Sequence, residues 1–326
     1  MTEAALERVS WQAALSERIR RNWDAAVVPV VFAVMVLTFY ALDPNYLSAT
    51  NIVNVLNQVS ILAVVTVGAS IVIFTGGFDL SAGAIVALTG VIGALVVDAT
   101  GSIALAVAAG IGSGLAVGVV NGMFVGYMGV SPLIVTLGAL NICRGLALIL
   151  AGGSPLYTFP LDYTAFGTSR FLDMPVLALI AFGLFALTAA VLRFTPLGLY
   201  IFAVGGNPRA AKISGLNVAA VRMTAFAISG ACCGLAGMML ASRTGGGEPA
   251  AGVAYELEAI AAVILGGAAL SGGEGRLWRS LMGILLLTAL GNGLNIVGIH
   301  PHWKGVAIGA ILVIAASLDA VKRRGQ

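Results

Sequence analysis

The sequence predicts an all-α polytopic membrane protein with about ten transmembrane or re-entrant helices, both termini in the cytoplasm and an internal repeat. Three observations predict this class. Of the 326 residues, 59% are hydrophobic and 10% are charged, the mean hydropathy is +1.02, and long apolar segments recur along the chain. Soluble domains carry about 25% charged residues. The composition therefore excludes a soluble enzyme or a nucleic-acid reader, and membrane lipid is the expected surrounding.

The apolar segments define the expected helices in order, since about 20 residues cross about 30 Å of hydrocarbon. They lie at about 25–42, 56–75, 81–97, 102–125, 131–150, 174–192, 223–241, 257–271, 280–298 and 303–319. Segment 257–271 is short enough to be re-entrant. The predicted organisation is a basic cytoplasmic N-terminal segment (1–24), a transmembrane domain (25–320) and a cytoplasmic tail (321–326). The polar start of the chain indicates a retained anchor rather than a cleaved signal peptide.

The lysines and arginines predict the orientation, because cytoplasmic loops carry an excess of both. With the N-terminus inside and all segments crossing, the predicted inside residues are Arg8, Arg18, Arg20, Arg21, Arg193, Arg209, Lys212, Arg222, Arg276, Arg279, Lys322, Arg323 and Arg324. Only Arg170, Arg243 and Lys304 are predicted on the opposite side of the membrane, and Arg144 lies within an apolar segment. This asymmetry favours an even number of crossings with both ends in the cytoplasm.

A glycine stripe marks the fourth segment. Its members recur every four residues at Gly110, Gly114, Gly118, Gly122 and Gly126. At 3.6 residues per turn they share one helix face, which lets another helix approach closely. The stripe predicts a tightly packed central helix rather than one that faces lipid. A substrate path along the stripe is the alternative.

A few polar residues interrupt the apolar segments and are candidates for a translocation path. An intramembrane acid is costly and is a functional candidate by default, and Asp79 is the one acid that the sequence places well for such a role. Alternatively, Asp79 or Ser81 caps the following helix. The other candidates are Asn121, Asn141, Arg144, Asn292 and Asn295, for which structural pairing is the alternative. Asn141 and Arg144 are three residues apart and share a helix face.

Several chemistries find no support in the sequence. There is no phosphate-binding P-loop motif, so any ATP hydrolysis is expected from a partner. Cys143, Cys232 and Cys233 lie in apolar stretches and are expected to be buried small hydrophobes. His300 and His302 have no acidic or thiol neighbours in sequence, so no metal is expected. No cofactor is expected, and no set of side chains for catalysis is present.

The basic stretch 193–222 is too long for a minimal connection. Within it, Asn207 is a good N-cap, Pro208 suits the first helical position, and Gly215 can end a helix. The stretch therefore predicts a short helix over 208–216, held at the membrane surface by basic residues. Such a helix is typical of a docking element. The aromatic loop 151–173 is predicted to lie on the opposite side.

A pattern occurs twice along the chain. Residues 76–83 (GGFDLSAG) and 266–273 (GGAALSGG) both read G-G-x-x-L-S-x-G. Asn121-Gly122 precedes Ser131-Pro132 much as Asn292-Gly293 precedes His300-Pro301. The first half has an extra stretch, about 84–100, long enough for one more helix. Transporters are commonly built from such repeats, with the path between them.

These motifs resemble the ribose/arabinose/xylose-type permeases of carbohydrate ABC importers, which belong to the branched-chain amino acid permease superfamily. GGFDLSAG is similar to their GG-[IF]-D-L-S-x-G signature. Residues 203–216 resemble their A-x-G-G-N-x-x-A-A-x-x-S-G-I loop, with Leu216 in place of isoleucine. NGLNIVG at 292–298 and GSP at 153–155 also resemble family motifs. The resemblance covers about residues 50–320.

The resemblance implies a multi-pass permease of the bacterial inner membrane. It implies three protein partners: an ABC ATPase subunit, a periplasmic sugar-binding protein and a second permease copy, most simply as a homodimer. It also implies that the 207–215 element is the coupling helix of the permease. The implied ATPase-coupling residues are Gly205, Gly206, Asn207, Arg209, Ala210, Ala211, Lys212, Ser214 and Gly215.

The expected function is therefore the permease subunit of an ABC importer for a monosaccharide, a pentose or hexose. Two alternatives remain. One is a permease of the same superfamily for a branched-chain amino acid or a nucleoside. The other is a secondary transporter or channel that works without a partner or ATP.

Overall fold

The computed structural model describes residues 28–300 and 302–324 of the chain, and this part is almost entirely helical. Seven of the described helices are long and apolar enough to cross a membrane. They are α2 (Ala49–Phe74), α3 (Ala82–Thr100), α4 (Ile103–Gly126), α5 (Pro132–Leu150), α7 (Val176–Phe194), α10 (Val218–Thr244) and α12 (Leu277–Ile296). The predicted polytopic, all-helical architecture is confirmed at this level.

The other described helices connect or flank these spans. They are the N-terminal helix Val28–Leu42, η1 (Pro44–Leu47), α6 (Leu161–Thr168), α8 (Pro196–Gly206), α9 (Pro208–Ile213), α11 (Tyr255–Leu265) and α13 (Trp303–Arg324). A two-stranded antiparallel hairpin joins β1 (Arg170–Phe171) to β2 (Met174–Pro175). The predicted residues Arg8, Arg18, Arg20 and Arg21, and all of segment 1–24, lie outside the described residues.

Helix ends follow local chemistry that the apolar pattern does not contain. The first long helix begins at Ala49 rather than near 56, because the Ser48 hydroxyl accepts the Asn51 N–H. The apolar pattern does not predict this start, because the first turns of α2 contain several asparagines. Ser102 caps α4 in the same way, and Gly101 ends α3 with a φ of +67°. The extra stretch near 84–100 is helix α3, as predicted.

Helix α11 is shorter than its predicted segment. Its 11 residues reach about 16 Å at 1.5 Å per residue, roughly half of the hydrocarbon thickness. Residues 245–254 before it are not helical. Helix α13 continues to Arg324, so the predicted tail boundary at 320/321 falls inside a helix.

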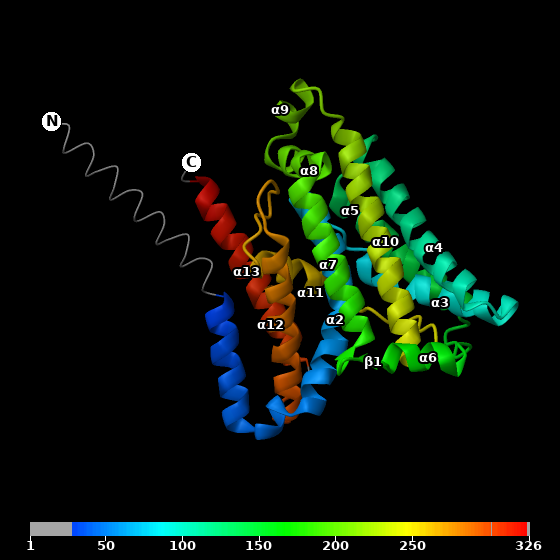
Figure 1. Cartoon of the computed structure of the whole chain (residues 1–326). Helices are drawn as coiled ribbons and strands as arrows, with labels where there is room; N and C mark the ends of the chain where they lie inside the picture. Colours follow the sequence, from blue (N-terminus) through cyan, green and yellow to red (C-terminus); the bar gives the residue numbers. More distant parts are fainter. Residues whose placement is uncertain (1–27, 301, 325–326) are drawn as a thin grey trace.

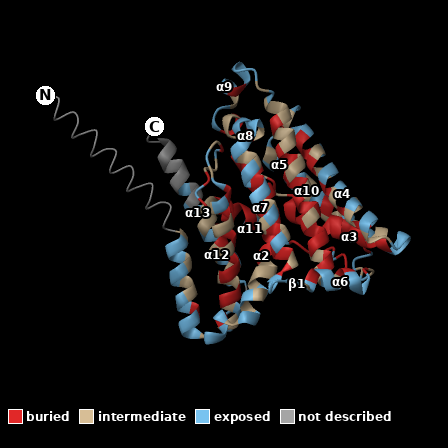
Figure 2. Cartoon of the chain, in the orientation of Figure 1, coloured by how far each residue is buried: buried red, intermediate tan, exposed pale blue. Residues whose placement is uncertain are grey.

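Helices α2, α3 and α10 form the centre of the chain, with α4 packed along α10 (Figure 1). Buried residues concentrate in α2, α3 and α10, while α4, α5 and α7 expose most of their outer surface (Figure 2). The two ends of the bundle differ. Helices α8 and α9 and the C-terminal end of α13 lie at one end, here called the α9 end (Figure 1). Helix α6, the hairpin and η1 lie at the other, here called the α6 end.

The glycine stripe of α4 lies against α10. A side chain at Gly118 would overlap the Phe226 carbonyl oxygen, and one at Gly122 would lie 2.7 Å from the Met223 Cα. The same face brings Gly110, Gly114 and Gly126 onto α10. The expected central position of α4 is wrong for the single chain. Its other face is exposed, because only the glycine side permits close backbone approach.

Candidate functional site

A buried polar cluster lies where α2 gives way to α3. The chain leaves α2 at Gly76, whose φ of +79° needs glycine. Asp79 then turns inward and is only 1% exposed. Its carboxylate accepts the Ser81 N–H at 3.0 Å, the Ser81 hydroxyl at 2.5 Å and the Ser229 hydroxyl of α10 at 2.8 Å. Three donors on one carboxylate compensate its burial.

The cluster reaches α4 and α5. The Asn121 amide of α4 donates to the Ser81 hydroxyl oxygen at 3.1 Å. The Thr136 hydroxyl of α5 lies 3.4 Å from the Phe78 carbonyl oxygen. The loop between α2 and α3 is thus bonded to three other helices. Asp79 binds the Ser81 N–H just ahead of α3, but no side chain caps the helix itself. Asp79 therefore anchors this junction, and the alternative that Asp79 or Ser81 caps α3 is wrong.

Asn121 also borders a groove of about 420 Å³ between α3, α4 and α5. The Cys143 thiol is the other weakly polar group there, and the remaining lining side chains are apolar. All three cysteines are free and buried, as predicted. The single chain therefore offers one amide to a solute at this groove. A pathway for a polar solute needs further groups from another surface.

Arg144 of α5 holds the non-helical segment before α11. Its Nη1 donates to the carbonyl oxygens of Pro249 at 2.8 Å and Ala251 at 2.6 Å. That segment runs along α3, since Gly247 lies against Gly90. Arg144 therefore joins α5 to a stretch far away in sequence.

An acid that the sequence analysis did not select completes this region. The Glu256 carboxylate occupies the space where a side chain at Gly83 would lie, beside the first turn of α3. It is close enough to Arg144 for charge attraction and to Asp79 for charge repulsion. The expectation that Asp79 is the one well-placed acid is therefore wrong. Glu256 stands just before an apolar run, where an acid looks like a loop residue.

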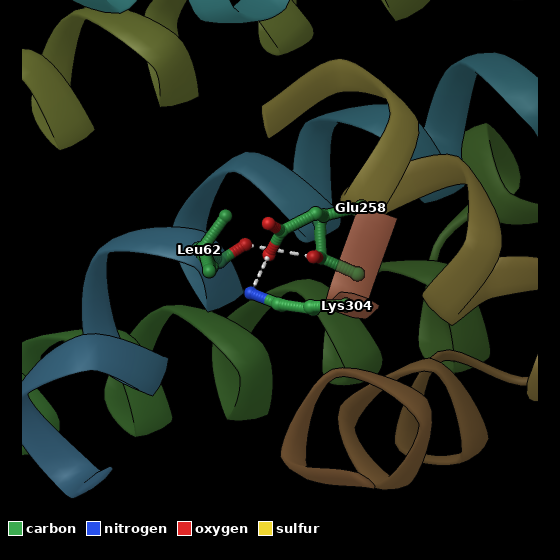
Figure 3. Close-up of polar contacts among 4 residues, drawn as sticks. Leu62, Glu258 and Lys304 are labelled. Atoms are coloured by element: carbon green, nitrogen blue, oxygen red, sulfur yellow. Dashed lines mark hydrogen bonds and ion pairs between the residues drawn. The ribbon is translucent and has the colours of Figure 1, made fainter. Parts of the chain in front are cut away.

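A second missed acid forms an ion pair inside the bundle. Lys304 Nζ of α13 lies 2.7 Å from Glu258 Oε2 of α11, and the two side chains are 22% and 11% exposed. Figure 3 shows the pair beside Leu62 of α2. Lys304 was expected in an outside loop. It instead lies in the first turn of α13, where its stem covers Gly291 of α12.

The remaining predicted path residues lie elsewhere. The side-chain amides of Asn292 and Asn51 bond reciprocally at 2.9 Å, near η1 at the α6 end. Asn141 is exposed and donates to the Leu137 carbonyl oxygen of its own helix. Asn295 is exposed. The structure thus brings together Asp79, Ser81 and Asn121 with Arg144 nearby, and separates the other three.

The predicted docking helix is present as α9 at the α9 end (Figure 1). The Asn207 side chain accepts the Ala210 N–H at 3.0 Å, Pro208 is the first helical residue, and Gly215 has a φ of +86°. Gly205 and Ala211 are buried. The other predicted coupling residues, Gly206, Asn207, Arg209, Ala210, Lys212, Ser214 and Gly215, are exposed.

The sequence analysis missed one residue of this surface. Ile213 at the end of α9 is 88% exposed. Its apolar side chain beside Arg209 and Lys212 gives α9 both an apolar and a basic contact surface. An isoleucine in an amphipathic sequence is normally expected to be buried, so the exposure of Ile213 could not be predicted from the sequence.

Residues 51–316 match the family model described as branched-chain amino acid transport system / permease component. The chain belongs to this family. It is 39% identical over 291 residues to the ribose import permease protein of Bacillus subtilis, covering 89% of this chain and 90% of that relative. It is 34% identical over 303 residues to the D-allose transport system permease protein of Escherichia coli, covering 91% and 92%. No solved structure matches the chain.

The galactose/methyl galactoside import permease protein of Escherichia coli is 34% identical over 315 residues, covering 90% of this chain and 93% of that relative. The predicted resemblance is therefore confirmed. Family membership and the apolar helices make the chain a multi-pass inner-membrane protein and a transport component rather than an enzyme.

Proposed function

We propose that this chain is the transmembrane permease subunit of an ATP-binding cassette importer for a monosaccharide. The observation that carries the proposal is α9, a capped, exposed, basic helix at one end of a bundle whose seven long helices are apolar. A chain without a P-loop needs an external source of energy, and α9 is a surface on which an ATPase can dock. The three relatives named above are permeases for ribose, allose and galactose, all uncharged sugars.

The α9 end is the cytoplasmic end in this proposal. Basic residues of α9 and of the loop before α12, such as Arg209 and Arg276, gather there, whereas Arg170 and Arg243 lie toward the α6 end. The positive-inside rule favours this orientation. It places both chain termini in the cytoplasm, and the ten expected segments cross or re-enter the membrane. The α6 end then faces a periplasmic sugar-binding protein.

The translocation path is assembled from two copies of the chain. Asp79, Ser81, Asn121 and Arg144 lie around the breaks at which α3 and α11 begin, which is where transporters place their solute sites. Asn141 points away from the single chain and lines the path only where a second copy covers that face. Asn292 of α12 has a structural role, because its side chain hydrogen-bonds Asn51 of α2. We assign no role to Asn295.

Docking through α9 is tested by reversing its chemistry. The Arg209→Glu/Ala210→Glu double variant places acids in the first turn of α9, where the helix dipole favours them, so α9 stays folded. We expect the variant to insert in the membrane but to lose the ATPase that copurifies with the unmodified chain. Quantitative mass spectrometry of the purified complex measures this loss.

The matched control is the Arg170→Glu/Ala165→Glu variant, which makes the same substitutions at exposed positions of the α6 end. It should retain the ATPase. Ile213→Asp should weaken docking without changing a basic residue. Unchanged ATPase recovery in both α9 variants would show that α9 is not the docking surface.

A branched-chain amino acid is the second candidate solute, because the family description names that class. A zwitterion needs paired charges, and Arg144 with Glu256 supplies both signs near the cluster. Thermal-shift assays of the copurified binding protein with D-ribose, D-allose, D-galactose and L-leucine distinguish the two. Stabilisation by leucine alone would replace the sugar proposal.

A further inference from the structure

Three chain segments meet backbone to backbone at the α9 end. They are the end of α2 at Phe74–Gly76, the end of α8 at Gly205–Gly206, and residues 271–273 of the loop between α11 and α12. The Gly273 N–H donates to the Phe74 carbonyl oxygen at 3.0 Å. The meeting point of these three segments is called here the glycine junction.

The contacts at the glycine junction leave no room for side chains. A Cβ at Gly205 would overlap the Phe74 carbonyl oxygen and the Gly273 nitrogen. A Cβ at Gly272 would lie 2.5 Å from the Gly76 nitrogen, and one at Gly273 would lie 2.6 Å from the Gly206 nitrogen. Beside these contacts the rings of Phe74 and Phe202 stack with centroids 5.2 Å apart.

The position of the junction in the chain gives it a consequence. Gly76 and residues 271–273 belong to the two G-G-x-x-L-S-x-G stretches, and Gly205 lies in the last turn of α8, three positions before α9 begins at Pro208. The end of α8, which leads into α9, therefore contacts both repeated turns. Asp79 follows Gly76 by three residues, so the same turn leads to the buried polar cluster.

Close packing of this kind transmits displacement, because there is no flexible side chain between the backbones to absorb it. Packed interiors respond to a push by shifting between discrete arrangements rather than by deforming gradually. A movement of α8 and α9 must therefore move the turn after α2 and the turn after α11 together, or break the contacts among them.

We propose that Gly205 is a positioning residue for transport, through which a displacement of α9 reaches both repeated turns at once. This inference rests on the proposed function, because it assumes that an ATPase moves α9. It goes beyond docking, because it states how the displacement of α9 is passed to the turn that leads to the buried polar cluster, namely through the backbone contacts of Gly205. Gly183 of α7 provides a control outside the coupling residues and the glycine junction, because it is exposed and a Cβ there would have no neighbour within 4 Å.

The experiment compares Gly205→Ala with Gly183→Ala in the complex of the chain with its copurified ATPase and binding protein, reconstituted in liposomes. Uptake of radiolabelled D-ribose, D-allose and D-galactose is measured alongside ATP hydrolysis. We expect Gly205→Ala to retain the ATPase and to hydrolyse ATP. The amount of sugar moved per ATP should fall at least about 5-fold, which is the lower end of typical allosteric coupling strengths. Gly183→Ala should match the unmodified complex.

The outcomes separate this inference from the proposed function. If the unmodified chain retains no ATPase and moves no sugar with ATP, the proposed function fails. If it does both and Gly205→Ala moves as much sugar per ATP as Gly183→Ala does, only the role of Gly205 is overturned. A merely structural defect would lower thermal stability or ATPase recovery without changing the sugar moved per ATP.

A second measurement avoids any variant that fails to fold. Hydrogen exchange of the unmodified complex is compared with and without a non-hydrolysable ATP analogue. Exchange should change together in peptides that cover 70–81, 203–216 and 266–276. A change in the α9 peptide without a change in the two turn peptides would refute transmission through the junction.

Discussion

Asp79, Arg144 and Glu258 are charged side chains with specific partners inside the bundle, and this limits which residues can be replaced singly. Asp79 receives three hydrogen bonds, and Arg144 gives two to backbone carbonyl oxygens. Glu258 and Lys304 pair directly. Such arrangements hold helices in register because a charge that loses its partner away from water is costly.

The Glu258–Lys304 pair allows a sharp residue-scale test. Glu258→Gln leaves the Lys304 charge without its partner among α11, α12 and α13, and we expect it to lower the free energy of unfolding by about 2–3 kcal/mol, somewhat less than for a fully buried pair. The double variant Glu258→Gln/Lys304→Met removes both charges and should recover most of that loss. Thermal unfolding in detergent, followed by intrinsic fluorescence, measures both. Equal destabilisation by the single and double variants would contradict a coupled pair.

Neither partner of this pair could be selected from the sequence. Glu258 stands in the polar start of YELEAIAAVIL, and Lys304 follows a His-Pro-His turn, so both look like loop residues. Their proximity depends on how α11 and α13 pack, which no local pattern encodes. Asp79 was recognised because its own surroundings are apolar on both sides, and its neighbour Ser81 came with it.

Two kinds of helix surface build the bundle at the scale of elements. Helices α4 and α10 meet through glycines, so their backbones approach closely, whereas α5 and α7 have few such contacts and expose apolar side chains. Apolar exposure on these helices suits lipid or a second copy. The close α4–α10 contact is therefore the strongest candidate for the rigid part of the chain.

Two glycines of α4 test that assignment. Gly118→Leu drives a side chain into the α10 backbone near Phe226, and we expect a lower melting temperature in detergent and poorer membrane yield. Gly112 lies on the exposed face of the same helix with no neighbour within 4 Å, so Gly112→Leu should leave the melting temperature nearly unchanged. Equal effects of the two variants would mean that the glycine face does not pack as the structure has it.

The sequence predicted most elements because their signals are local. The apolar runs, the Asn207 cap and the four-residue glycine spacing each act within one helix or turn. The truncated α11, the inserted segment 245–254 and the central role of α10 were not predictable in this way. Each depends on contacts between distant segments, such as Gly247 with Gly90 and Gly252 with Gly83.

At the scale of the whole molecule, α9 offers a surface on which an ATPase can dock, whereas the sequence has no P-loop motif with which the chain itself could bind ATP. Helix α9 stands clear of the apolar helices at one end (Figure 1). The two repeated turns contact the end of α8, just before α9, at the glycine junction. The charged residues inside the bundle are engaged with other protein groups rather than arranged as a relay across it. This arrangement favours ATP-driven import over a self-sufficient carrier.

The energy source can be tested with the purified components in liposomes. The chain alone should move no D-ribose, D-allose or D-galactose, with or without a proton or sodium gradient, because its buried charges are held by hydrogen bonds and ion pairs. Addition of the copurified ATPase, ATP and the binding protein should start uptake, and an ATPase with its P-loop lysine replaced should not. Gradient-driven flux through the chain alone would favour a secondary transporter. Asp79, Glu256 and Arg144 would then be the first residues to replace, because Asp79 lies in the break between α2 and α3, Glu256 lies beside the first turn of α3, and Arg144 is close enough to Glu256 for charge attraction.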